Sequence, residues 1–165
     1  ISATLAIIVC IPMFLSDSAM RTSRSLQRPA QDQLAAYVNQ VQKPLGYGIV
    51  DPTYRPIIAA LMAQIGYIDQ SISILRDQLK KNPRDFEALQ ILSSIYEQTG
   101  KTQLALPSRK SIVALDPYNP EAYLKYIQDL KVAGNVEEAR AVNSQLQLLA
   151  PLSTEAKQAI TELTG

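Results

Sequence analysis

A 34-residue period in the sequence constrains the fold of this chain more than any other feature. Three columns of residues recur at this step: a proline (Pro83, Pro117, Pro151), a glycine (Gly66, Gly100, Gly134) and a small residue (Ser71, Ala105, Ala139). The chain has six glycines, so half of them fall in one register. Such a period is typical of arrays in which each repeat is one small unit that packs on its neighbours.

Each column has a physical role in a helix–turn–helix unit. The glycine ends the first helix, because a left-handed backbone costs it little. The small residue lies where the two helices cross, and the proline ends the second helix because it has no N–H. Apolar residues fall between these columns at helical spacing: Leu89, Leu92, Tyr96, Ile112 and Leu115, then Tyr123, Tyr126, Leu130, Leu146 and Leu149. The sequence therefore predicts antiparallel helix pairs.

With Leu92 and Tyr96 ahead of Gly100, and "GNVEEA" at 134–139, the sequence resembles the tetratricopeptide repeat (TPR) family. The resemblance implies an all-α, TPR-like helix–turn–helix solenoid at 52–165. Its expected parts are three units, at 52–85, 86–119 and 120–153, and a closing helix at 154–163. The sequence departs from the family pattern at four places: Arg55 replaces a large apolar residue, Arg109 and Asn143 replace an aromatic one, and Pro107 lies within a predicted helix.

The chain ahead of the repeats has two parts. Residues 1–20 begin with an apolar run, "ISATLAIIVCIPMFL", and form a predicted assembly or anchor segment. Residues 21–51 are a predicted linker and capping helix; apolar residues at helical spacing place the helix at 30–43. We expect this helix to cover the N-terminal face of the repeats, the alternative being contact with another subunit.

Composition excludes most catalytic chemistry. The chain has no histidine, a single cysteine (Cys10), and 16 basic against 15 acidic residues. A histidine base and a Cys/His metal cluster are therefore excluded, and the balanced charge gives no signal for nucleic acid. We predict that the chain is not an enzyme and holds no cofactor or metal.

Members of the TPR family usually bind peptides or protein surfaces in a groove lined by the first helix of each unit. By register, the resemblance places nine residues of this chain on that groove: Glu87, Gln90, Ser94, Glu97, Gln98, Glu121, Leu124, Gln128 and Lys131. The set is mixed, and mostly neutral or acidic. The basic clamp of chaperone-binding members is missing, so an acidic C-terminal peptide is not the expected ligand.

Two functions follow from the apolar start. In the first, the chain is a structural subunit of an extracellular or cell-surface filament, a pilus-like homopolymer assembled from copies of itself. The residues expected to be buried in that assembly are Ile1, Leu5, Ile7, Ile8, Ile11, Phe14 and Leu15. Exposed together, they would form an apolar patch larger than a monomer tolerates. Only the general plan is pilin-like, because Leu5 stands where bacterial type IV pilins carry a glutamate.

In the second, the chain is a membrane-anchored TPR adaptor that binds partner proteins in envelope assembly or secretion. The apolar run is then the remainder of a membrane span, and Arg21, Arg24 and Arg28 mark its cytoplasmic side. A span needs roughly 20 apolar residues, and residues 1–15 provide fewer. The sequence favours the filament narrowly.

Overall fold

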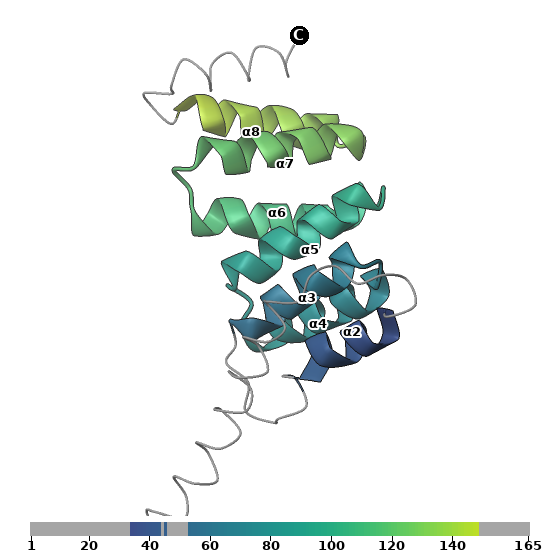
Figure 1. Cartoon of the computed structure of the whole chain (residues 1–165). Coiled ribbons are helices and arrows are strands. Elements are labelled where there is room, and N and C mark those ends of the chain that lie inside the picture. Colours follow the sequence, from purple (N-terminus) through teal and green to yellow (C-terminus); the bar gives the residue numbers. More distant parts are fainter. Residues whose placement is uncertain (1–33, 44, 46–52, 149–165) are drawn as a thin grey trace, which may run out of the picture. The chain divides into compact units, whose positions relative to one another are not determined.

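The computed structural model describes residues 34–43, 45 and 53–148, and their regular elements are helices without a strand (Figure 1). The helices are α2 (Leu34–Gln42), α3 (Tyr54–Gln64), α4 (Ile68–Lys81), α5 (Phe86–Gln98), α6 (Thr102–Leu115), α7 (Pro120–Val132) and α8 (Val136–Leu148). The chain divides after Pro83 into two compact units, Ile1–Pro83 and Arg84–Gly165. The predicted all-α, TPR-like fold is confirmed. The apolar segment and the closing helix predicted at 154–163 lie outside the described residues.

The three glycines of the repeat make the same turn between the two helices of a pair. Gly66, Gly100 and Gly134 have φ values of 91°, 70° and 80°. At the middle turn, the N–H of Gly100 donates to the carbonyl of Glu97 (3.0 Å) and the N–H of Lys101 to that of Tyr96 (2.7 Å). The other two turns contain the equivalent bonds. This pattern satisfies carbonyls left free at the helix end, and it joins α3 to α4, α5 to α6 and α7 to α8.

Side-chain caps begin the first helices of the second and third pairs. The Asp85 carboxylate accepts a hydrogen bond from the N–H of Ala88 (3.0 Å). The Asn119 side chain accepts from the N–H groups of Glu121 (3.1 Å) and Ala122 (3.3 Å). Such caps satisfy donors that have no partner within the helix. Since Pro120 is the first residue of α7, where its missing N–H costs nothing, the helical pattern restarts soon after α6 ends.

The first unit has its core between α2 and α3. Val38 of α2 is buried with Ile58 and Met62 of α3, so α2 packs on the first helix pair. Within that pair, the small-residue column is Ser71, which is fully buried. Its hydroxyl donates to the carbonyl of Ala59 at 2.7 Å, so the crossing of α3 and α4 is held by a hydrogen bond as well as by close packing.

The second unit has a core cluster among α6, α7 and α8. The buried residues of this cluster are Leu106, Tyr123, Tyr126, Ile127, Leu130, Ala139, Val142 and Leu146. In α7 and α8 its members recur mostly three or four residues apart, which places them on one face of each helix. The predicted apolar periodicity of these helices is therefore the packing face of the repeats.

Pro107 does not interrupt α6, which runs from Thr102 to Leu115. A proline inside a helix removes the hydrogen bond to the carbonyl four residues earlier, here that of Gln103. Both residues are exposed. The departure from the family pattern at Pro107 is thus accommodated on the solvent side of the helix.

Replacing Gly100 by alanine is expected to lower the free energy of unfolding by about 1–2 kcal/mol, the cost of a left-handed backbone for an L-residue. Apart from Gly100 and its two chain neighbours, no residue has an atom within 4 Å of the added Cβ, so the effect comes from the backbone alone. Urea denaturation measures it. The control is Gly100→Asn, which should cost less because asparagine tolerates this conformation. An alanine variant as stable as the parent would contradict the assigned turn.

Candidate functional site

The nine residues predicted for a groove all lie on α5 and α7. Seven are exposed, and Ser94 and Leu124 are half-buried. The opposite face of α5 carries its buried residues, among them Leu89, Leu92 and Tyr96. The helical period therefore turns a row of polar side chains toward solvent on each of these two helices. Whether this row binds a ligand stays a prediction.

The second helix pair is joined to α7 by a buried arginine that contacts two carboxylates. The Nε of Arg109, on α6, donates to Oδ2 of Asp129 on α7 at 2.8 Å. Its NH2 group donates to Oε2 of Glu97 on α5 at 2.7 Å. The side chains of Arg109 and Asp129 are 6% and 2% exposed, whereas that of Glu97 is 41% exposed. Glu97, on the predicted groove, is thus the solvent-facing end of a buried ionic network.

The network contains two carboxylates and one guanidinium, so it carries an excess of negative charge. Burial raises the pKa of the Asp129 carboxyl, and the Arg109 guanidinium opposes that rise. A guanidinium can donate to two carboxylates at once because its N–H groups form a planar fork. The pairing keeps Asp129 compensated inside the protein, and it holds the Glu97 carboxylate in one orientation.

Sequence reasoning identified two of the three members, but not their connection. Glu97 appeared as a groove residue, and Arg109 as a departure from the family's aromatic position. Asp129 was not singled out. The available signal was its place on the buried face of α7, next to Leu130 and three residues after Tyr126. An acid there requires a cation nearby, and Arg109 occupies a core position of the preceding helix.

A second polar contact joins α7 to α8. The Tyr126 hydroxyl donates to Oε1 of Glu138 at 2.7 Å, and Lys110 of α6 lies 3.5 Å from the same oxygen. Burial and this hydrogen bond raise the pKa of the Tyr126 hydroxyl. The bond from Tyr126 lowers the pKa of Glu138, and the charge of Lys110 adds to the effect. These contacts join α8 to α6 and α7.

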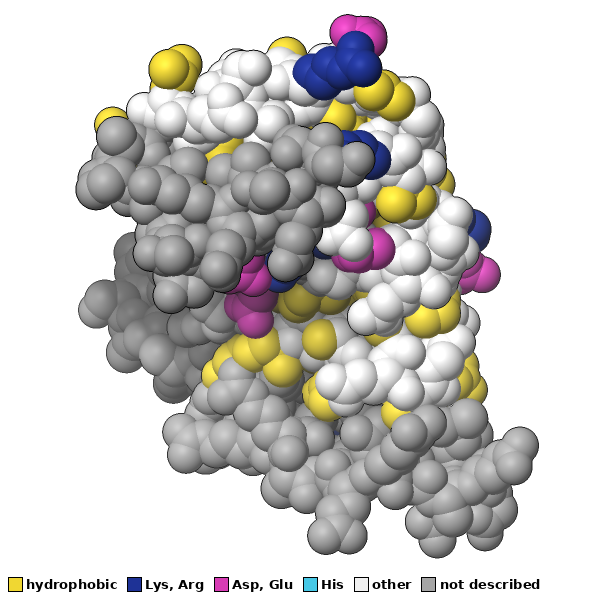
Figure 2. Space-filling model, turned by 90° about the horizontal axis from the view of Figure 1, so that it is seen from above, with side chains coloured by type: hydrophobic (Ala, Val, Ile, Leu, Met, Phe, Trp, Pro, Cys, Tyr) yellow, Lys and Arg dark blue, Asp and Glu magenta, His cyan; other side chains and the backbone are white. Residues whose placement is uncertain are grey.

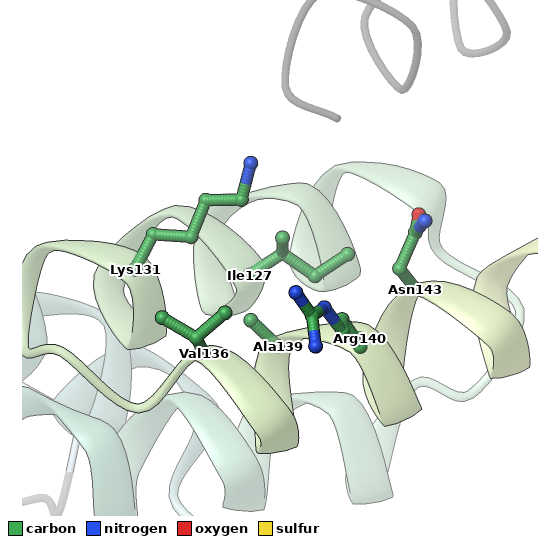
Figure 3. Close-up of a pocket in the computed structure, with 6 residues that line it drawn as sticks. All are labelled: Ile127, Lys131, Val136, Ala139, Arg140 and Asn143. Atoms are coloured by element: carbon green, nitrogen blue, oxygen red, sulfur yellow. The ribbon is translucent and has the colours of Figure 1, made fainter. Parts of the chain in front are cut away.

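A depression of about 200 Å³ lies on the surface formed by α7 and α8 (Figure 3). Six described residues line it: Ile127, Lys131, Val136, Ala139, Arg140 and Asn143. Its floor is apolar, and Figure 3 shows the amino group of Lys131 directed away from Ile127 and Ala139. The depression combines an apolar floor with two cationic side chains and one amide.

The face seen in Figure 2 has no patch of a single charge among its visible described residues. On the side seen in Figure 2, the basic and acidic side chains of the described residues are scattered rather than gathered by sign. Across residues 34–43, 45 and 53–148, no group of three His, Cys, Asp or Glu side chains could hold a metal ion. No helix in this part of the chain is both long and apolar enough to cross a membrane.

The helical repeats resemble solved structures of a protein named MamA. "MamA 41-end from Desulfovibrio magneticus RS-1" superposes with a TM-score of 0.68 at 16% identity, over 90% of this chain and 83% of that one. "MamA MSR-1 C2" has a TM-score of 0.62 at 16% identity, over 91% of this chain and 83% of that one. At this identity the likeness establishes the fold alone. No family model matches the sequence, and no curated protein matches it.

The prediction of a pilus-like filament subunit is wrong. Over nine-tenths of the chain the fold superposes on that of MamA. The prediction rested on the apolar composition of residues 1–15, and composition does not specify what a segment contacts. Its seven assembly residues, from Ile1 to Leu15, lie outside the described residues. The alternative, a TPR adaptor, agrees better with the fold, but nothing in the described residues supports a membrane anchor.

Proposed function

We propose that the chain is a protein-binding scaffold that holds an extended segment of a partner against the exposed faces of α5 and α7. The observation that carries this proposal is the Glu97 carboxylate. It is 41% exposed, and the buried Arg109 holds it in place. An oriented carboxylate loses little side-chain freedom on binding, which lowers the entropic cost of the contact.

The charges of the two helices favour a partner segment with basic residues. α5 contains Glu87 and Glu97 and no basic residue. The charges of α7 balance, because Glu121 and Asp129 stand against Lys125 and Lys131. Lysine or arginine side chains of the partner would be complementary to this face, whereas an acidic segment would be repelled. The proposal concerns the repeats alone, since residues 1–20 lie outside the described residues.

The test is fluorescence anisotropy with three synthetic peptides of equal length, whose charged positions carry arginine, serine or glutamate. We expect the arginine peptide to bind most tightly. Glu97→Gln should weaken its binding about two- to fivefold, the value of one exposed ion pair. Glutamine can still accept from Arg109, so the fold should persist. The difference in affinity between variant and parent should shrink as salt is added, because exposed charges are screened.

The matched control is Asp77→Asn, which removes one exposed acidic charge from α4, a second helix of a pair. This variant should bind the arginine peptide as the parent does. Equal binding of all three peptides would contradict the proposed partner chemistry. An equal loss in the two variants would show that net charge, rather than the face of α5, governs the interaction.

A further inference from the structure

Two oppositely charged residues occupy the same place in successive repeats. Glu97 and Lys131 are 34 residues apart, and each is the last residue but one of its helix, α5 or α7. Both side chains are exposed. Because a 34-residue step carries one position of a repeat onto the same position of the next, the two charges belong to one row across the exposed face of α5 and α7.

A shared contact indicates how far apart these two residues lie. Arg109 donates to Glu97 of α5 and to Asp129 of α7, so one guanidinium holds the Glu97 carboxylate beside the end of α7. Lys131 follows Asp129 by two residues, about 3 Å along the helix axis and just over half a turn around it. Asp129 therefore faces inward, and Lys131 faces solvent. One helix width, roughly 10 Å, is thus the scale of the separation between Lys131 and the Glu97 carboxylate.

Neither charge is neutralised by another exposed side chain of the described residues. Within this part of the chain Lys131 has no ion-pair partner, and the ion pair of Glu97 is with the buried Arg109. Lys125 and Glu121, by contrast, pair with each other along α7 at 2.9 Å. The C-terminal ends of α5 and α7 therefore present one carboxylate and one ammonium group that are available to a partner of complementary charge.

We propose that the partner segment carries a basic and an acidic side chain three residues apart, the basic one bound by Glu97 and the acidic one by Lys131. This pattern rests on the proposed function, and it adds to that function an acidic group and a spacing. In a polyproline II segment, residues three apart share a face and lie roughly 9 Å apart, which matches the separation of the two charges. In a β-strand, residues that share a face lie roughly 7 or 13 Å apart, so the match is poorer.

Fluorescence anisotropy with three proline-rich peptides of equal length tests this pattern on the full chain. The first peptide has an arginine and a glutamate three residues apart, in both orders. The second has the same two residues adjacent, and the third has serine in place of the glutamate. The first, in the better of its two orders, should bind about two- to fivefold more tightly than the others, the value of one exposed ion pair. Lys131→Gln should make the affinities of the first and third peptides equal.

Reversing the charge of Lys131 should reverse the preference. In Lys131→Glu the face presents two carboxylates, so a fourth peptide with arginine at both positions should bind more tightly than the arginine–glutamate peptide. The matched control is Lys80→Glu on α4, which makes the same change in net charge at a side chain that is 76% exposed. This variant should keep the preference of the parent. Circular dichroism of both variants checks that the fold persists.

The outcomes separate this pattern from the proposed function. If the three peptides bind equally well and all lose affinity in Glu97→Gln, the charge pattern is overturned and the proposed function stands. If no peptide binds, both are overturned. Equal changes of preference in Lys80→Glu and Lys131→Glu would show that net charge decides, contrary to the proposal. A dimer in light scattering that Lys131→Glu dissociates would make a second copy the occupant of this face, which also contradicts it.

Discussion

Replacing Arg109 by methionine is expected to lower the free energy of unfolding by about 3–5 kcal/mol, the cost of removing one partner of a buried ion pair. Methionine fills a similar volume, so the loss measures the charge left behind rather than a cavity. Asp129, whose side chain is 2% exposed, would remain without its guanidinium partner. Urea denaturation, followed by circular dichroism, provides the measurement.

The control replaces both partners. In the double variant Arg109→Met/Asp129→Leu no buried charge remains, and most of the lost stability should return, because apolar pairs often replace buried ion pairs at no cost. Arg109→Lys should be intermediate, since an ammonium lacks the fork that contacts both Asp129 and Glu97. If the double variant is as unstable as Arg109→Met, the loss comes from packing and not from charge.

The loss of unfolding free energy caused by Arg109→Met should also depend on pH. Burial already raises the pKa of Asp129 above its unfolded value, and Arg109 opposes this rise. Removing Arg109 therefore raises the folded-state pKa further. A group with a raised folded-state pKa binds its proton more tightly when folded, so lowering the pH stabilises the folded state. The difference in unfolding free energy between variant and parent should shrink as the pH is lowered from neutral toward the pKa that Asp129 has in the unfolded chain. A difference independent of pH would show that Asp129 is not the group left uncompensated.

Replacing Ala105 by leucine is expected to lower the free energy of unfolding by about 1–3 kcal/mol, because the core at this point has no room for the larger side chain. Ala105 is fully buried where α6 crosses α5, and the added atoms would force the two helices apart. A thermal melt of variant and parent measures the loss. An unchanged melting temperature would contradict the close crossing at this residue.

Ala139→Leu is the comparison within the same repeat column. Ala139 is also buried, but it lines the depression on α7 and α8. Part of a leucine side chain can extend into that space, so this variant should lose less stability than Ala105→Leu. Equal losses would show that the depression cannot accept the added atoms.

The repeat pattern alone determined the helix pairs of this protein. Gly100 and its two counterparts had to adopt a positive φ, because the chain reverses there within a few residues. The prolines had to end helices, and Ala105 had to lie at a crossing. These are local requirements of backbone geometry, and each can be recognised from one residue and its spacing.

The polar contacts between helices were decided only by the tertiary structure. Arg109 and Asp129 are 20 residues apart, and no local rule pairs them. Their role depends on the packing of α6 against α7, which excludes water and makes an unpaired charge costly. The same buried arginine donates a hydrogen bond to Glu97 of α5, a contact that sequence spacing did not indicate. Sequence spacing identifies the positions that face a neighbouring helix, but the arrangement of the helices decides which charges meet there.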